Sequence, residues 1–401
     1  MRTFWKCNQK HRLSGGRNPL VRITNISKDG YMDYSEVIYI SEQLGDSLKR
    51  TQVFPGDLVV SQRGSLGQCA IVDNTYQKLN ISANIIAIKH IQKTSAEFVR
   101  DYVLSSLGQL QLERSTSGQV QQKITTQDIA DVLIPVGCDE KKLSSILQNA
   151  LLTCYRKRAQ AQQKLESMEN KITDIYSFGS SSKHKLYYAI RLSQLDGVID
   201  AKRYMSSMNN HALQLCDICD ILDEKVNALS YGNSIVDWIR IDDLPNNPID
   251  IENVRTINAS KMDGTFFEVQ VGDILVARLG PTILNQKVVM VRNIERTTLA
   301  SAEFLVLRCK QGYNAETVMA VIKSKPFRDL MYSHSRGSTP SRYRLNREDA
   351  LKLPFPDIRE RQDSLANEVS NVREKAKSLF YEATQEWQAA KQQFEKELLG
   401  V

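Results

Sequence analysis

The feature that most constrains the fold of this chain is a segment that occurs twice. The first copy is PGDLVVSQRGSLG at 55–67, and the second is VGDILVARLG at 271–280. In each copy a Gly-Asp pair precedes an apolar run, and a glycine follows that run. Because Gly56 recurs as Gly272, 216 residues later, the repeated unit has the size of a domain and not of a solenoid repeat.

The segments that follow each copy also correspond, and they keep the same order. Each copy is followed by a second apolar run, then by a loop containing Gly and Ser, and then by an apolar segment with a proline. The corresponding pairs are 81–89 with 300–308, 115–125 with 334–346, and 130–135 with 351–356. A chain of 401 residues is expected to form two to three domains, so two copies of one domain agree with its length.

Short apolar segments around turns predict strand pairs at 20–41 and 238–257. Each pair has an arginine in its first strand, Arg22 or Arg240. The fold class is therefore expected to be α+β, with short strands that form small, curled sheets.

Apolar residues at helical spacing predict helices over 95–115 and 314–335. Pro326 should break or kink the second of these helices. A short amphipathic helix is also expected at 213–226.

Two longer segments have the pattern of coiled-coil helices. They run from Asp139 to about Tyr176 and from about Ile358 to Leu399, and apolar residues recur in them at spacings of three and four. At 1.5 Å per residue each helix would be roughly 60 Å long. The apolar seams are Leu143, Leu147, Ala150, Cys154, Ala161, Leu165, Met168, Ile172 and Ile175, and Leu365, Val369, Val372, Ala376, Leu379, Ala383, Trp387, Ala390, Phe394 and Leu398. We expect the helices to pair as an antiparallel coiled coil; the alternative is two unrelated long helices.

The repeat and the long helices together predict four parts, related by a pseudo-two-fold internal repeat. These are a first domain at 1–138, a spacer helix at 139–178, a second domain at 179–357 and a C-terminal spacer helix at 358–401. The Ser- and Gly-containing stretch 177–184 is expected to be the linker out of the first long helix.

Composition excludes some classes of protein. The chain has 53 Lys and Arg against 46 Asp and Glu, a net charge of +7, and this mild basic excess agrees with a nucleic-acid partner without requiring one. The 7 cysteines are scattered and odd in number, which indicates reduced thiols and a cytoplasmic protein. No stretch approaches the roughly 18 apolar residues of a membrane-spanning helix.

Motifs that would indicate catalysis or metal binding are weak or missing. Cys216 and Cys219 have CxxC spacing with His211 nearby, but a zinc site would need a second pair at comparable spacing. Asp57 and Asp273 follow a glycine and are interpreted as turn-formers, not as catalytic carboxylates. The sequence contains no Walker A, HExxH or N-P-P-[YF] methyltransferase motif. We therefore expect no catalytic residue, no cofactor and no metal on this chain.

The order of parts and several short segments resemble the DNA-specificity subunit of type I restriction–modification systems. Each globular unit has a Gly-Asp strand similar to that of the family. The family's exit segment is matched by Leu345-Asn346 with Asp349, and in the first half by Ile124-Thr125 with Asp128. RLSQLDGVIDAKRY at 191–204 is similar to the family's R-L-D-A-x-Y segment. The first unit has no such leading segment, so the N-terminal end is expected to be shortened.

The resemblance implies two target-recognition domains that read a bipartite sequence in double-stranded DNA. It implies a non-catalytic subunit that directs a methylation subunit, in two copies, to the target. S-adenosylmethionine would be bound by that partner, and a motor–nuclease subunit can join the complex. Two alternatives stay open: a coiled-coil scaffold for protein–protein contacts, and the recognition part of a larger restriction–modification enzyme.

Candidate DNA contacts are polar residues of the repeated loops, where Gly118 and Gly337 allow a close approach to the DNA backbone. Arginine can read guanine and glutamine can read adenine, while Ser and Lys suit phosphates. The candidates in the first domain are Arg63, Arg114, Ser117, Gln119, Gln121, Gln122 and Lys123, and in the second Arg278, Asn285, Gln286, Lys287, Arg336, Ser338, Arg342, Tyr343 and Arg344. Beside the helix seam, Leu151, Tyr155, Phe380 and Tyr381 are candidates for contact with the methylation subunit.

Overall fold

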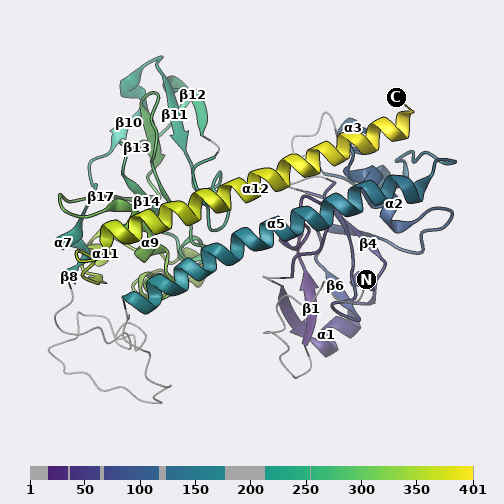
Figure 1. The fold of residues 1–401 in the computed structure, drawn as a ribbon, viewed down its shortest axis with the longest axis horizontal. Helices are drawn as coiled ribbons and strands as arrows, with labels where there is room; N and C mark the ends of the chain where they lie inside the picture. The colour runs from purple at the N-terminus through teal and green to yellow at the C-terminus, as the bar shows by residue number, and fades with distance from the viewer. Residues whose placement is uncertain are drawn as a thin grey trace. The chain divides into compact units, whose positions relative to one another are not determined.

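The computed structural model describes residues 17–34, 37–63, 67–116, 123–176, 213–252 and 254–400 (Figure 1). By its internal contacts the chain divides into unit 1, Met1–Ala159 with Phe380–Val401, and unit 2, Gln160–Leu379. There are two long helices in the described residues, α5 (Glu140–Ile175) and α12 (Gln362–Leu399). Each contributes one segment to unit 1 and another segment to unit 2. Within the described ranges, no helix is both long and apolar enough to cross a membrane.

Unit 1 contains two small sheets and a set of short helices. Its strands are β1 (Arg17–Val21), β2 (Ile38–Ser41), β3 (Gln52–Val53), β4 (Leu58–Ser61), β5 (Cys69–Ile71), β6 (Leu79–Ile81) and β7 (Ile85–Ile88). Its short helices are α1 (Glu42–Ser47), α2 (Ala96–Leu104), α3 (Ser106–Thr116) and α4 (Thr126–Ala130). The strands pair in the orders β2-β1-β6-β3 and β5-β4-β7, and β1 with β6 is a parallel pair.

Unit 2 has two corresponding sheets and a short strand pair. Its strands are β8 (Leu213–Gln214), β9 (Cys219–Ile221), β10 (Val226–Asn227), β11 (Ile235–Ile239), β12 (Arg255–Asn258), β13 (Thr265–Glu268), β14 (Ile274–Ala277), β15 (Val288–Met290), β16 (Thr298–Ser301), β17 (Phe304–Cys309) and β18 (Pro354–Phe355). Its short helices are α7 (Leu215–Ile218), α8 (Gly280–Leu284), α9 (Ala315–Lys323), α10 (Lys325–Ser333) and α11 (Arg347–Leu351).

The sheets of unit 2 follow the same pairing order as those of unit 1. They run β10-β13-β16-β11-β12 and β15-β14-β17-β9, and β11 with β16 is again a parallel pair. Each of these sheets therefore carries one additional edge strand, β10 or β9, and both come from the segment that precedes the strand pair of unit 2.

The repeated Gly-Asp pair makes the same turn in both units. Gly56 and Gly272 have φ of 95° and 93°, a backbone region that glycine adopts without strain. The carboxylates of Asp57 and Asp273 each accept a hydrogen bond of 2.9 Å from the backbone N–H three residues earlier. The interpretation of these aspartates as turn-formers is confirmed, because the side chain bonds to its own turn.

The helices expected at 95–115 and 314–335 are each divided in two. The breaks fall at Ser105 and Ser324, whose backbones are extended, with ψ of 163° and 146°. Pro326 lies at the start of α10, as its missing N–H favours. The first break contains no proline that would have announced it. The prediction of one continuous helix over 95–115 is therefore wrong. The Ser105 hydroxyl bonds to both adjoining helices and stabilises the break.

The segment 213–226 contains the short strands β8 and β9, the start of β10 and a four-residue helix, and not the expected amphipathic helix. Only α7 is helical, between β8 and β9. In β9 buried and exposed residues alternate, and the strand pairs antiparallel with β17. The open edge of the sheet accepts a strand whose side chains alternate between two faces, and this pairing prevails over the helical spacing.

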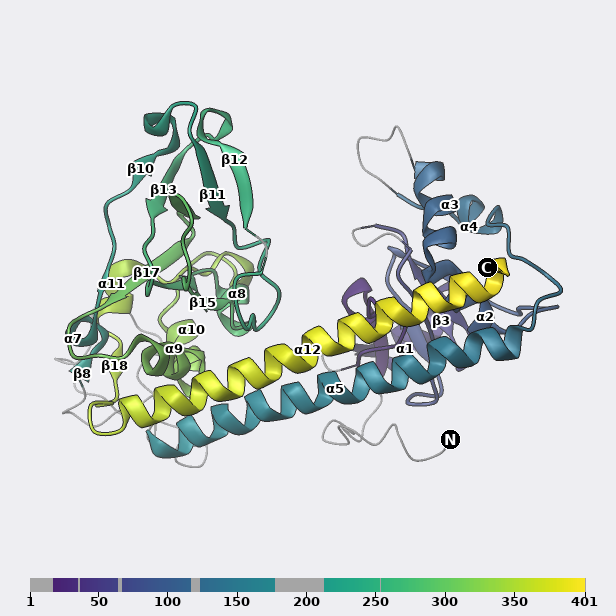
Figure 2. The same cartoon turned by 45° about the horizontal axis from the view of Figure 1, so that its top comes forward.

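Within unit 1, the first part of α5 lies antiparallel to the last part of α12 (Figure 2). Lys142 pairs with Glu397 at 2.6 Å, and Lys157 pairs with Glu382 at 2.8 Å and Glu386 at 2.6 Å. Between the helices lies an apolar seam that shares one core with α2. Its buried members are Leu143, Leu147, Cys154, Ala383, Trp387, Ala390 and Phe394.

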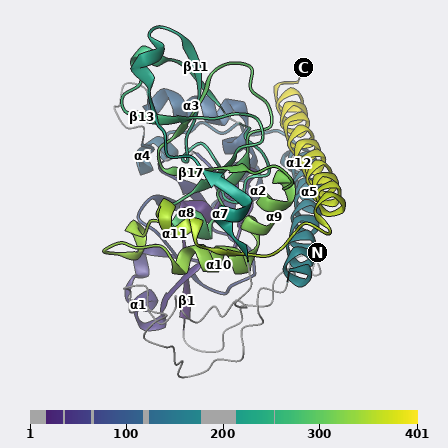
Figure 3. The same cartoon turned by 90° about the vertical axis from the view of Figure 1, so that its left-hand side faces the viewer.

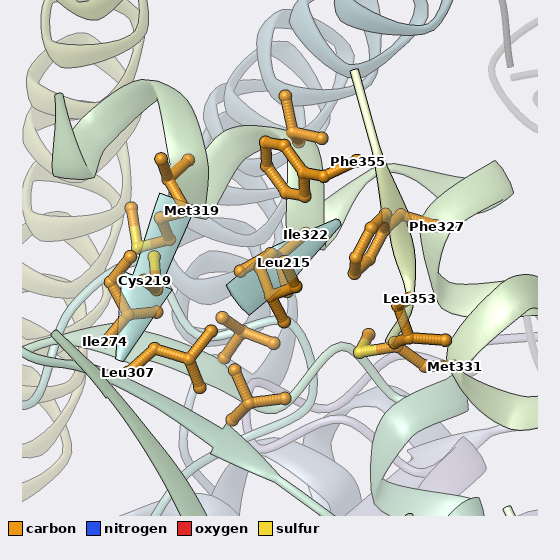
Figure 4. Close-up of a cluster of buried hydrophobic side chains, with 14 of the residues drawn as sticks. Leu215, Cys219, Ile274, Leu307, Met319, Ile322, Phe327, Met331, Leu353 and Phe355 are labelled. Atoms are coloured by element: carbon orange, nitrogen blue, oxygen red, sulfur yellow. The ribbon is translucent and has the colours of Figure 1, made fainter. Parts of the chain in front are cut away.

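Within unit 2, one core joins the sheet β15-β14-β17-β9, the short helices and the segments of the two long helices, and a separate cluster lies between the two sheets. Figure 4 shows part of the first core, where the rings of Phe327 and Phe355 meet edge to face at 5.4 Å. Met168 and Ile172 of α5 and Leu365 of α12 belong to the same core. Figure 3 shows α9 beside the ends of these two helices.

A network of ion pairs connects α9 to α12 and to the loop before β12. Arg292 and Arg373 both contact the carboxylate of Glu316, Arg373 at 2.5 Å. Arg292 and Lys377 contact Asp250 at 3.3 and 3.1 Å. Burial acts to raise the pKa of Glu316, but the two arginines outweigh it and hold that pKa below its usual value.

Replacing Glu316 with Gln should lower the free energy of unfolding at neutral pH by about 2 kcal/mol, because both arginines lose a charged partner. Folding depresses the pKa of Glu316, so its stabilisation is present above the usual pKa of 4.5 and is lost as the pH falls through the folded value. Urea unfolding at several pH values should therefore show the gap between wild type and variant closing below pH 4.5.

The matched control is Glu374→Gln, which removes an exposed carboxylate that also contacts Arg373. Its cost should stay below about 0.5 kcal/mol at every pH. Equal costs for the two variants would contradict the assignment of the stabilisation to Glu316.

Candidate nucleic-acid interface

The loop after α10 in unit 2, residues 334–346, is closed at its base by backbone hydrogen bonds. Arg336 and Arg344 exchange two N–H···O bonds, of 2.9 and 2.8 Å. The N–H of Leu345 donates to the carbonyl of Arg278 at 2.9 Å. The loop is therefore anchored to the residue that follows β14, and its side chains are held at that end of the strand.

Gly337 is required by the shape of this loop. A Cβ on Gly337 would lie 2.5 Å from the carbonyl oxygen of Arg342. The 3-10 turn η7 (Pro340–Arg342) brings that carbonyl across the loop. The close approach that Gly337 allows in this structure is thus to the loop's own backbone.

Two carboxylates hold three of the four arginines at the loop. Arg344 bonds through Nε and Nη2 to Glu303 at 3.2 and 3.0 Å, and Arg278 Nε reaches the same carboxylate at 3.4 Å. Arg336 pairs with Asp349 at 2.9 Å. The sequence prediction named the arginines but missed the part of Glu303, although this residue lies between the repeated strands β16 and β17.

Arg342 makes no ion pair with any described residue, and its side chain is exposed. It follows Ser341 at the end of η7 and precedes Tyr343, whose ring packs against Tyr332 with centroids 5.9 Å apart. Ser338 is exposed in the same loop. Four arginines against two carboxylates leave a net positive charge at this loop. The exposed guanidinium of Arg342 carries the charge that is available to a phosphate or a base edge.

Three residues predicted to contact DNA lie apart from this loop, directly after α8. Gln286 is buried, and its Nε2 lies 3.2 Å from Oε2 of Glu169 on α5. The Lys287 ammonium donates to a backbone carbonyl at 3.0 Å, and burial lowers the pKa of Lys287. Asn285 is half-buried, and its carbonyl accepts a backbone bond of 2.8 Å. The amide of Gln286 is thus bonded inside the unit, and DNA contact by these three residues stays a prediction.

The corresponding loop of unit 1 has the same anchor. The N–H of Ile124 donates to the carbonyl of Gln62 at 3.0 Å, just as Leu345 donates to Arg278 in unit 2. Gln62 follows β4 as Arg278 follows β14, and both Ile124 and Leu345 are buried. Each unit thus ties the end of its loop to the end of the same strand.

The structure places only some of the residues predicted for this loop. Arg63 and Arg114 are exposed, and Lys123 is half-buried beside the anchor. Ser117, Gly118, Gln119, Gln121 and Gln122 lie outside the described residues. Their reading of adenine therefore stays a prediction.

The four residues predicted to contact a partner protein differ in their surroundings. Tyr155 packs edge-on against Tyr31, with ring centroids 5.5 Å apart, and Leu151 packs against the core of unit 1. Phe380 is half-buried, whereas Tyr381 is 66% exposed. Tyr155 and Leu151 therefore contribute to packing inside unit 1, and Tyr381 is the most accessible of the four.

An open groove of about 560 Å³ follows the same helix segments in unit 1. Its lining is mostly small or polar side chains together with Ile146: Ser145, Ile146, Asn149, Ala150 and Thr153 of α5, and Glu386, Ala389, Ala390 and Gln393 of α12. None of the four residues predicted for partner contact lines this groove.

Across the described part of the chain, no group of three or more His, Cys, Asp or Glu residues is placed to hold a metal ion. Cys216 is half-buried on α7 and Cys219 begins β9, so the two cysteines do not lie on one helix. His211 lies outside the described residues.

No protein-family model matches the chain, and no curated protein matches it. Two solved structures are similar to it. One is a chain from a study of the structural basis of complex assembly and conformational transition of the type I R-M system, with 15% identity, coverage of 96% of this chain and 94% of that chain, and a TM-score of 0.38. The other is the HsdS subunit from Thermoanaerobacter tengcongensis, with 14% identity, coverage of 95% and 90%, and a TM-score of 0.34.

These two neighbours, a type I R-M complex and a specificity subunit, are of the class that the sequence resembles. At such TM-scores the likeness carries no argument about function, which rests on the chain's own contacts.

Gly337→Ala should open the loop of unit 2 at its base, because the new Cβ would lie 2.5 Å from the Arg342 carbonyl. Amide hydrogen exchange at Arg336 and Arg344 should then rise about tenfold or more, as their mutual bonds break. Ser338→Ala is the control, since Ser338 is exposed and should leave exchange unchanged. Unchanged exchange in both variants would mean that the loop has another shape in solution.

Proposed function

We propose that this chain is a sequence-specific DNA-binding subunit that reads a bipartite target with two recognition domains and directs a methyltransferase to it. The observation that carries the proposal is the shared loop anchor, Ile124 to Gln62 in unit 1 and Leu345 to Arg278 in unit 2. Two loops whose ends are anchored in the same way on the same strand end support a proposal of two corresponding recognition surfaces, one in each unit. Bipartite recognition needs such a pair, because each half-site requires its own reader.

The charges at the loop of unit 2 support a polyanionic ligand. Glu303 bonds Arg344 through two nitrogens, which orients the guanidinium and leaves Nη1 as a further donor. For Arg342, which is exposed and has no ion pair within the described residues, we propose contact with a phosphate or a guanine edge. For the first unit, whose loop is rich in glutamine, we propose adenine contacts by Gln119, Gln121 and Gln122.

The two long helices are proposed to act as the spacer. Within each unit their segments pack together, with Lys157 to Glu382 in unit 1 and Lys171 to Glu368 in unit 2. We propose that they form one antiparallel coiled coil that relates the two recognition domains by a pseudo-two-fold axis. The gap between the half-sites would then be set by helix length and not by the loops.

The partners follow from the same proposal. The chain itself would have no catalytic role, and S-adenosylmethionine would be bound by a methylation subunit, present in two copies on the two pseudo-equivalent sides. An additional motor–nuclease subunit is proposed to join the same complex.

Arg342→Ala should weaken binding of duplex DNA and reduce the slope of log Kd against log salt by about one if the residue contacts a phosphate. If it reads a base, the variant should instead lose about 1–3 kcal/mol on one sequence and relax one position of the second half-site. Fluorescence anisotropy with a random duplex pool at several salt concentrations, followed by sequencing of the bound pool, measures both effects.

Arg359→Ala is the control, because Arg359 is an exposed arginine outside the loop, paired with Asp357 at 2.5 Å. It should bind as wild type does. Wild-type DNA binding that does not depend on the salt concentration, or the absence of DNA binding, would favour the alternative of a coiled-coil scaffold for protein–protein contacts. A change in the first half-site caused by Arg342→Ala would contradict the proposal that each domain reads its own half-site.

Tyr381→Glu should reduce co-purification with the methylation subunit of the same organism while the circular dichroism spectrum stays unchanged. Tyr381 is 66% exposed on α12, where an apolar ring open to solvent favours a protein contact. Leu133→Glu, at an apolar residue of unit 1 that is 78% exposed and lies outside the long helices, is the control. Equal complex formation by both variants would exclude Tyr381 from the docking surface.

A further inference from the structure

Two cysteines of unit 2 face each other across adjacent strands. Cys219 of β9 is directly opposite Cys309 of β17 in the antiparallel register. The bond beside the pair runs from the Lys310 N–H to the Ile218 carbonyl, and a bond from the Leu222 N–H to the Val306 carbonyl continues the same alternation three residues after Cys219; each is 2.9 Å long. This pattern makes the cysteines a non-hydrogen-bonded pair, the position where opposite Cα atoms approach to about 4.5 Å.

That position suits a disulfide. Disulfides need Cα atoms about 4.4–6.8 Å apart and Cβ atoms about 4 Å apart, and a non-hydrogen-bonded pair of facing strands meets both needs. The two sulfur atoms lie 3.4 Å apart, in contact but not bonded to each other. Closing the bond would therefore need a small rotation of the side chains and no movement of the strands.

The two thiols differ in access. Cys219 is fully buried, and Figure 4 shows it beside Met319 and Ile274 in the core. Cys309 is half-buried. The hydrogen bond with Cys309, together with burial, raises the pKa of the Cys219 thiol. An oxidant from solvent would therefore meet Cys309 first.

We propose that Cys219 and Cys309 form a dithiol site that is converted reversibly to a cross-strand disulfide by a small-molecule disulfide. The Cys309 thiolate attacks one sulfur of that molecule, which forms a mixed disulfide and releases one thiol. The Cys219 sulfur, whose hydrogen bond to Cys309 is then lost, attacks Sγ of Cys309 and expels the second thiol. The two cysteines lose two electrons and two protons, and the small disulfide gains them as two thiols.

The consequence is local to unit 2. The residues are 90 positions apart in the chain, so the bond closes a long loop that includes β11 to β16. It also ties the edge strand β9, which follows the segment 177–212, to the sheet that carries β14 and the loop anchor at Arg278. Closing a long loop stabilises the folded state chiefly by restricting the unfolded chain. This inference does not depend on the proposed DNA function.

The test is incubation of the full-length protein with oxidised glutathione, then alkylation, proteolysis and mass spectrometry. We expect one peptide pair that links Cys219 to Cys309 with the loss of two hydrogens, and its disappearance after dithiothreitol. The urea midpoint of unit 2, followed by hydrogen exchange, should rise on oxidation. Glutathione that stays attached to Cys309 without the internal bond would overturn the proposal.

Cys216→Ser is the matched control, because Cys216 lies three residues from Cys219 and its sulfur contacts Gln214 and not the pair. It should form the same crosslink as wild type, whereas Cys309→Ser should form none and show no shift in the urea midpoint. A crosslink between Cys216 and either partner would also overturn the proposal. Peptide mapping of the wild type needs no variant, so a poorly folded Cys309→Ser leaves the test intact.

Discussion

Burial of the apolar stripes on the two long helices is the constraint on which the rest of the structure depends. A helix of this length with one apolar face is not stable alone in water, and its stability comes from packing of that face. In unit 1 the stripe of α5 meets that of α12 through Leu147, Cys154, Ala383 and Phe394, and the same side chains complete the core under α2. The two helices therefore form part of the domain cores and also connect the domains along the chain.

The ion pairs of unit 2 also depend on the packing of the two long helices against the domain. α9 contributes Glu316, which is bonded by Arg292 of the unit and by Arg373 of α12. Glu169 of α5 likewise accepts Arg328 at 2.8 Å and Gln286 at 3.2 Å. These contacts join polar groups at the edge of a shared apolar core.

At the loop itself, acidic residues decide which arginines are available. Glu303 bonds Arg278 and Arg344, and Asp349 bonds Arg336, so three of the four guanidinium groups are oriented by a carboxylate and Arg342 alone has no ion pair with a described residue. Oriented guanidinium groups lose less freedom on binding than mobile ones, and specificity depends on such orientation. The acidic residues are thus part of the candidate interface, although they repel DNA when considered singly.

The features that could be predicted from the sequence are those that a local pattern of residues determines. The 3–4 spacing of apolar residues determined α5 and α12, and the Gly-Asp pair determined its turn, because only glycine adopts that φ without strain and aspartate bonds its own backbone. Tertiary structure decided the rest. The segment 213–226 has helical spacing but pairs with a sheet edge, and the helix at 95–115 breaks where Ser105 bonds both sides. Gln286 is polar and near a turn, yet it is buried against Glu169 on a helix more than a hundred positions away. The register that sets Cys219 opposite Cys309 is equally non-local, because strand pairing joins segments whose spacing in sequence carries no signal.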